Sequence, residues 1–253
     1  MCEHLKEKLL VPGVWQITQP SNGVYTDVDM YLIDGKDKAL LVDGGNSVQD
    51  LCGFLGKLTD KPIELLITHG HGDHAACIQQ FEKVYMSHTD IDIMNWMLGL
   101  TIEPTQISDL KGGEIIDLGD HQLEVITLPG HTLGSVALLD RERQLLFSGD
   151  SLGSGLIWMQ LPNCTSIKDY LQELNKLENE IKDMTNLKLC VGHSQQSESE
   201  LGLQYFKDLK TAAEGIVTGE MVGTPTMEYN EYYKGLITAY GQMKGFVYKP
   251  DRI

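Results

Sequence analysis

The sequence predicts an α/β domain in which two half-sheets pack face to face and carry helices on their outer sides. Two observations support this fold class. Strand-like and helix-like segments alternate along the first half of the chain, and a second group of strands followed by helices makes up the later part. No repeat, low-complexity tract or linker interrupts the 253 residues, so a single domain is expected over residues 1–253.

Strands are expected where short apolar runs end at glycine or at polar turn residues. The expected strands are 14–18, 29–33, 39–43, 63–68, 84–87, 114–118, 122–127, 135–140, 144–148 and 187–191. Helices are expected where apolar residues recur every three or four positions. The expected helices are 47–58, 75–81, 89–98, 166–183 and 198–217. Residues 198–253 are interpreted as a helical and tyrosine-rich C-terminal extension, in which 228–240 covers the core or forms a homodimer contact.

Composition restricts the partners and the compartment. Lys and Arg total 20 against 36 Asp and Glu, a formal charge of −16, and such a surface repels nucleic acid and anionic membranes. No run approaches the roughly 20 apolar residues of a membrane helix, and the N-terminus has no signal-like apolar stretch. The five cysteines are dispersed and lack C-x-x-C spacing, which favours reduced thiols and a cytoplasmic location.

A cluster of metal-ligand side chains follows the predicted strand 63–68. It reads His69-Gly-His71-Gly-Asp73-His74. Extended backbone sends side chains i and i+2 to one face, so His69 and His71 can share an ion. Three imidazoles and a carboxylate within six residues would be costly to bury unless a positive ion neutralised them. The cluster therefore predicts a metal site.

Three later residues fit the same pattern. His131 lies in a turn between two predicted strands, while Asp150 and His193 each come at the end of a strand. A glycine precedes each of them, at strand exits where functional side chains commonly gather. With these elements the sequence closely resembles the metallo-β-lactamase superfamily, and within it the glyoxalase II-like branch. The resemblance covers about 14–193.

The resemblance implies an αβ/βα four-layer sandwich with two metals at the sheet edge. One metal would take His69, His71 and His131, and the second would take Asp73, His74 and His193, with Asp150 bridging both. Imidazole and carboxylate ligands without thiolate suit zinc, with iron or manganese as alternatives. A hydroxide bridging the two metals would be the nucleophile, and Asp73 is also expected to orient it, as a catalytic residue.

Four further residues are candidates for roles around the metals. Asp43, in Leu-Val-Asp-Gly-Gly, matches the superfamily aspartate that supports a ligand imidazole through its N–H. Tyr25 lies in a polar loop, in a region that often overhangs the metals in this superfamily. Trp158 and Met159 follow Asp150 by one loop, where they would line a substrate pocket or pack in the core.

The expected activity is metal-dependent hydrolysis of a small acyl compound, namely a thioester, an ester or a lactone. The alternatives are a phosphodiesterase acting on a small molecule, because the same ions can stabilise phosphoryl transfer, and a mononuclear-iron sulfur dioxygenase. Glutathione thioesters carry carboxylates, which need cationic partners. Residues 151–167 contain no Lys or Arg, which is a departure from the glyoxalase II pattern.

Overall fold

The first of two large sheets is formed by the N-terminal half of the chain. The computed structural model describes residues 5–21, 26–153, 155–197, 200–225, 237–241 and 244–253. The seven strands lie in chain order: β1 (Lys6–Val11), β2 (Val14–Gln19), β3 (Val28–Asp34), β4 (Ala39–Val42), β5 (Ile63–Leu66), β6 (Val84–Met86) and β7 (Ser108–Asp109). β1 to β4 pair antiparallel, and β4 to β7 pair parallel. The parallel half is connected through α1 (Leu51–Leu55), α2 (Gly72–Ala75) and α3 (Ile91–Leu98).

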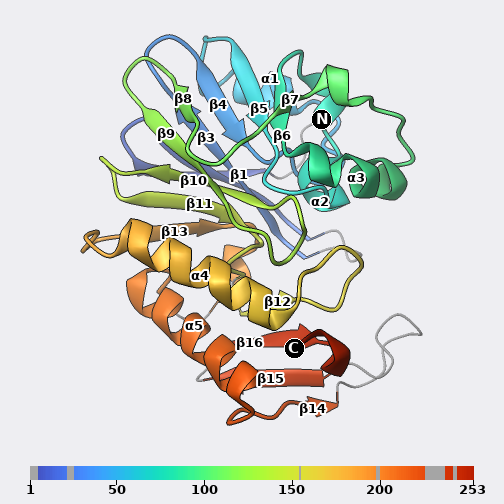
Figure 1. Cartoon of the computed structure of the whole chain (residues 1–253). Coiled ribbons are helices and arrows are strands. Elements are labelled where there is room, and N and C mark those ends of the chain that lie inside the picture. The colour runs from blue at the N-terminus through green and yellow to red at the C-terminus, as the bar shows by residue number, and fades with distance from the viewer. Residues whose placement is uncertain (1–4, 22–25, 154, 198–199, 226–236, 242–243) are drawn as a thin grey trace.

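The second sheet has five strands in the order β13-β11-β10-β9-β8. Its strands are β8 (Ile115–Asp117), β9 (Gln122–Thr127), β10 (Val136–Asp140), β11 (Leu145–Gly149) and β13 (Lys188–Val191). β13 joins β11 in parallel after the long helix α4 (Ile167–Ile181), and α5 (Leu203–Thr218) follows β13. In Figure 1 the two sheets lie between α1–α3 on one side and α4 and α5 on the other.

Alternating side chains of each central strand explain the four layers. On β3, Met30 and Leu32 belong to the core beneath α1–α3, whereas Tyr31 and Ile33 belong to the core between the sheets. Because side chains along a strand point to opposite faces, one strand can bury both. Tyr31 meets Phe147 of β11 edge to face, with the ring centroids 5.4 Å apart. The predicted αβ/βα sandwich is confirmed.

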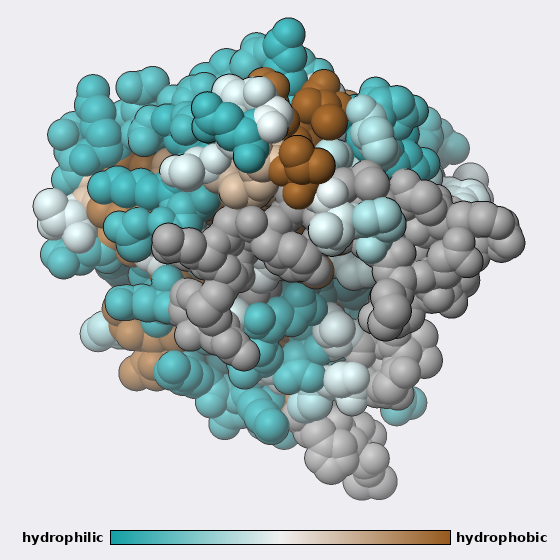
Figure 2. Space-filling model, turned by 90° about the horizontal axis from the view of Figure 1, so that it is seen from below, coloured by the Kyte–Doolittle hydropathy of each residue, from teal (hydrophilic) through white to brown (hydrophobic). Residues whose placement is uncertain are grey.

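A third, four-stranded sheet was not expected from the sequence. Its order is β12-β16-β15-β14, and its strands are β12 (Leu156–Trp158), β14 (Thr224–Pro225), β15 (Ile237–Gly241) and β16 (Lys244–Tyr248). β12 comes from the loop after β11 and pairs parallel with β16. The sheet packs beside α5 at the bottom of Figure 1, and in Figure 2, which views the molecule from below, the described residues are mostly hydrophilic, with hydrophobic residues exposed in several places.

Three predicted helices differ from the structure. The helix expected over 47–58 is only α1, Leu51–Leu55, and its N-cap is Asp50. Of the helix expected over 75–81, only Ala75 lies in α2, and Ile78–Gln80 forms a 3-10 turn; the Gln80 side chain bonds the backbone of Val48 and Leu51. The helix expected from residue 198 begins at Leu203, because the Leu189 N–H donates to the Leu201 carbonyl and keeps Leu201 and Gly202 extended beside β13.

The role of the tyrosine-rich stretch 228–240 stays a prediction, because most of it lies outside the described residues. The division into one domain with an extension over 198–253 likewise stays a prediction. Within the described residues, no helix is both long and apolar enough to cross a bilayer.

Candidate metal centre

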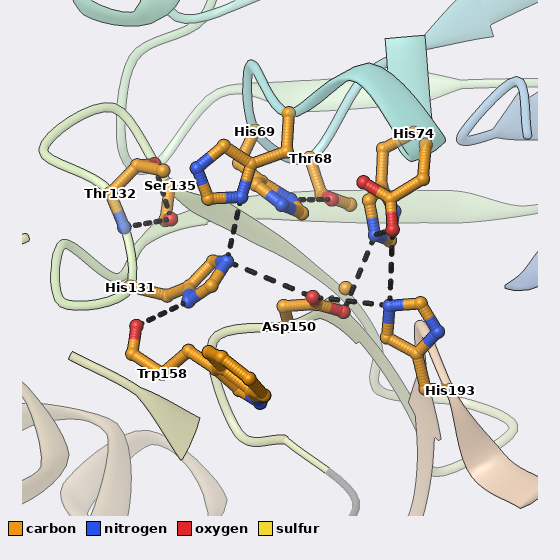
Figure 3. Close-up of polar contacts among 12 residues, drawn as sticks. Thr68, His69, His74, His131, Thr132, Ser135, Asp150, Trp158 and His193 are labelled. Carbon is orange, nitrogen blue, oxygen red and sulfur yellow. Dashed lines mark hydrogen bonds and ion pairs between the residues drawn. The ribbon is translucent and has the colours of Figure 1, made fainter. Parts of the chain in front are cut away.

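The seven predicted ligands come together where strands of the two large sheets end. His69, His71, Asp73 and His74 follow β5 and run into α2, His131 lies in the turn between β9 and β10, and Asp150 and His193 follow β11 and β13. Figure 3 shows five of these side chains, His69, His74, His131, Asp150 and His193, converging on one space, with Asp150 between His131 and His193.

Three sets of three residues each place one ligand atom within 4.8 Å of the others. Two of them, His69 with His71 and His131, and Asp73 with His74 and His193, are the groups that the sequence resemblance implies, and the third joins His69, His74 and Asp150. His131 Nε2 lies 2.9 Å from His71 Nδ1. Asp150 lies between the two implied groups, with Oδ2 3.7 Å from His131 Nε2 and 3.3 Å from His193 Nε2, and Oδ1 3.4 Å from His74 Nε2.

Hydrogen bonds on the far side of two of the rings orient their inner nitrogens. His131 Nδ1 lies 2.9 Å from the Trp158 carbonyl, and His193 Nδ1 lies 2.6 Å from the Asp27 carbonyl. A carbonyl oxygen only accepts, so both Nδ1 atoms donate and both Nε2 atoms face the shared space.

Three buried atoms at the centre lack a hydrogen-bond partner, and this fits a metal. They are His69 Nε2, His74 Nε2 and Asp150 Oδ1, of which the last two lie 3.4 Å from one another as an ion pair. Buried polar atoms are nearly always hydrogen-bonded, so atoms of this kind that converge without hydrogen bonds suit a cation. The donor set of imidazoles and carboxylates, with no thiolate among them, suits a divalent ion such as zinc.

Electrostatics divides the cluster into two parts. Burial lowers the pKa of His71 to about 3, and burial also holds the pKa of His69 and of His131 below the usual value, so these rings are neutral and their lone pairs are available. Burial opposes protonation of His193 as well, but Asp150 and Asp73 raise the pKa of that ring to about 10. A group of neutral imidazoles thus lies beside imidazole–carboxylate pairs.

Asp43 contacts the cluster from behind. Its carboxylate accepts from the Thr68 N–H at 2.8 Å and from the Thr68 hydroxyl at 2.9 Å, and Oδ2 lies 2.9 Å from His74 Nδ1. Asp43 has a positive φ of 64°, a left-handed conformation that costs a non-glycine residue energy and that occurs preferentially at functional sites.

The three predicted pocket residues are placed differently. Trp158 is partly exposed, and Figure 3 shows its indole beside His131 and Asp150. Met159 is fully buried in the core cluster that includes α4 and α5, so it packs rather than lines an open pocket. Tyr25 lies outside the described residues.

Cations near the centre come from a part of the chain that the sequence did not connect with it. Lys249 and Arg252 follow β16, which pairs with β12, and Arg252 Nη1 donates to the Leu161 carbonyl at 2.8 Å. Burial raises the pKa of the Cys164 thiol to about 12, and the charges of Arg252 and Lys249 act against that rise. Cys164 Sγ in turn donates to the His131 carbonyl at 3.0 Å. Within the described residues neither cation forms an ion pair.

Two further buried carboxylates, Asp29 and Asp90, hold the loops that carry the ligands. Both are fully buried, and neither was singled out from the sequence. An isolated aspartate in a strand or before a helix carries no local signal of such a role, because its partners lie far away in the chain.

Comparisons with known proteins agree with this geometry. A sequence profile described as the metallo-beta-lactamase superfamily matches residues 25–193. The chain is 27% identical over 214 residues to human acyl-coenzyme A thioesterase MBLAC2, covering 69% of this chain and 76% of that protein. It is 28% identical over 160 residues to a hydroxyacylglutathione hydrolase of Francisella tularensis, covering 60% of this chain and 59% of that one. A metallo-beta-lactamase structure from Pontibacter korlensis superposes with a TM-score of 0.67 at 17% identity, covering 83% of this chain and 99% of that one.

Proposed function

The chain belongs to the metallo-β-lactamase superfamily, and we propose that it is a metal-dependent hydrolase of thioesters whose thiol part is anionic. The observation that carries the proposal is that buried imidazole nitrogens and a carboxylate oxygen converge without hydrogen bonds at the centre of the ligand cluster. The thioester class is supported by the relatives, a thioesterase of acyl-coenzyme A and a hydrolase of hydroxyacylglutathione. Both of those thiols carry negative charge.

The proposed cofactor is a pair of zinc ions. His69, His71 and His131 would hold one, Asp73, His74 and His193 would hold the other, and Asp150 would contact both. When bound, such ions act as Lewis acids and lower the pKa of bound water to about 7.

The residues of the chain then bind and orient the reactants. The pKa of Asp73 is lowered to about 2, because the neighbouring His74 and His193 outweigh the effect of burial, so the carboxylate is ionised and accepts a hydrogen bond from the attacking water. The indole of Trp158 lies beside the centre. Lys249 and Arg252 are placed to attract the charged part of the thiol.

A panel of matched substrates tests the proposal. The protein is assayed with one acyl group attached to coenzyme A, to glutathione and to N-acetylcysteamine, and with the corresponding oxygen ester. We expect hydrolysis of the thioesters, loss of activity on treatment with a chelator and recovery when zinc is restored. Turnover of a phosphodiester without thioester hydrolysis would overturn the proposal, as would oxygen consumption by protein that contains one iron and no zinc.

A further inference from the structure

Asp90 joins two ligand-bearing loops that belong to different sheets. Its Oδ2 accepts from the Gly70 N–H at 2.9 Å and from the Thr132 hydroxyl at 2.6 Å, and its Oδ1 accepts from the Gly134 N–H at 2.8 Å. Gly70 lies between His69 and His71, while Thr132 follows His131. One carboxylate thus fixes the backbone beside all three imidazoles of one predicted metal group.

The contact is so close that the chain needs glycine at both backbone donors. A Cβ added to Gly70 would lie 2.6 Å from the Asp90 carbonyl oxygen, and one added to Gly134 would lie 2.5 Å from Asp90 Oδ1. Real Cβ atoms do not approach so closely, so any other residue would push the loops away from Asp90. Two glycines next to the metal ligands are therefore explained by the carboxylate that they meet.

Asp29 holds the loop that carries His193, a member of the other proposed metal group, in the same way. Its Oδ2 accepts from the N–H and the hydroxyl of Ser194, at 2.8 and 2.5 Å, and its Oδ1 accepts from the Thr18 hydroxyl. Its backbone N–H donates to the Gly192 carbonyl at 2.7 Å. The residues on both sides of His193 are thus attached to β3 of the opposite sheet.

We propose that Asp90 and Asp29 are positioning residues, and that each of them orients the ligands of one of the two proposed metal groups. Asp90 sets the spacing of His69, His71 and His131, and Asp29 sets the position of His193 against Asp73 and His74. The proposal rests on the metal-binding part of the proposed function and does not depend on the substrate.

The chemistry of both residues supports a role beyond packing. A fully buried carboxylate loses its hydration, and three donated hydrogen bonds compensate only if their geometry is held. An apolar side chain would fill the same space without that requirement. What the carboxylate adds is direction, because its two oxygens fix donors from both sheets at defined points.

Zinc binding, measured site by site, tests the proposal. Asp90→Asn and Asp29→Asn keep the shape but turn one acceptor into an N–H donor that faces another donor. Zn²⁺ affinity is measured by chelator competition, and the imidazole nitrogens are followed by ¹⁵N NMR during the titration. We expect Asp90→Asn to weaken binding about 10–100-fold at the rings of His71 and His131 while His193 titrates as in the wild type, and Asp29→Asn to do the reverse.

Milder variants and a matched control separate positioning from general stability. Thr132→Val and Ser194→Ala each remove one hydroxyl donor and should show the same selectivity with smaller effects. Thr59→Val removes a Thr–Asp hydrogen bond of the same 2.6 Å length, to Asp34 at the far end of β3. That variant should lose stability and bind Zn²⁺ with wild-type affinity at both groups.

The outcomes are distinguishable. If the wild-type histidine rings take up no Zn²⁺, the proposed function fails and this inference fails with it. If the wild type binds but Thr132→Val and Ser194→Ala bind equally well at every ring, only the positioning roles are overturned. Equal weakening of both groups in every variant, Thr59→Val included, would show that these hydrogen bonds contribute stability alone.

Discussion

Replacing Asp43 with asparagine should separate metal binding from backbone conformation. Asparagine tolerates the left-handed conformation that Asp43 adopts at φ 64°, so the main chain has no reason to move. The side chain, however, keeps one acceptor where the carboxylate had two. The new NH₂ faces either the Thr68 N–H or His74 Nδ1. The first orientation lowers stability, and the second lowers metal affinity.

The size of the effect follows from these contacts. With NH₂ against the Thr68 N–H, a buried hydrogen bond becomes a donor–donor contact, which costs about 1–3 kcal/mol. For a chain of this length that lowers Tm by roughly 2–12 °C. With NH₂ against His74, Nδ1 must accept, the proton moves to Nε2, and His74 can no longer bind a metal through that atom. Loss of such support costs about 10–100-fold in metal affinity.

Chelator-competition titration with Zn²⁺, together with thermal unfolding of the metal-free protein, distinguishes the two orientations. Asp140→Asn is the matched control, because Asp140 is also a buried carboxylate beside an imidazole, 3.4 Å from His121 Nδ1. The Val136 N–H donates to the Thr68 carbonyl, which lies next to His69. Asp140 lies four residues farther along β10, ~13 Å from Val136. Wild-type Zn²⁺ affinity in Asp43→Asn, with an unchanged Tm, would refute the reasoning.

Three other predictions follow from the site and its surroundings. Asp73→Asn should cut kcat heavily while zinc stays bound by His69, His71 and His131. Near-normal turnover in this variant would contradict the orienting role of Asp73. His131→Ala, in contrast, should lower zinc content and Tm together. Arg252→Ala should raise KM for a coenzyme A thioester and leave KM for the uncharged N-acetylcysteamine thioester unchanged, and an equal rise for both would exclude a charge contact. Burial opposes ionisation of Asp140, but His121 and Arg143 still hold the pKa of Asp140 below its usual value. The stabilising effect of Asp140 is therefore present above its unfolded-state pKa and is lost as pH falls through its folded-state pKa. Urea titration at several pH values should show that the free energy of unfolding falls less steeply in acid for Asp140→Asn than for the wild type.

Much of the centre could be predicted from the sequence because its ligands occur in short motifs at strand ends. A pair such as His69 and His71 reveals its geometry locally, since two residues on extended backbone share a face. Asp43 could be predicted for a similar reason, because it lies beside two glycines at the end of a strand.

The remaining features depend on contacts between distant segments. Thr132 and Asp90 are separated by 42 residues, and no periodicity in the sequence joins them. β12 has only three residues, too few for an alternating pattern, so neither the third sheet nor the approach of Arg252 to residue 161 could be expected. Helix 75–81 was wrong because side-chain bonds from Gln80 to another segment override a locally plausible helix.

The hydrogen bond between Asp29 and Ser194 spans 165 residues and has a consequence for synthesis of the chain. A ribosome releases His69, His71, Asp73 and His74 well before His131, Asp150 and His193 exist. The nascent chain would therefore display half of the proposed ligand set without the partners that fix its geometry. If these residues bind metal as proposed, the complete site forms only when the second sheet docks, a step limited by closure of very long loops. Metal supplied late in folding, rather than during translation, should then govern the yield of metal-loaded protein.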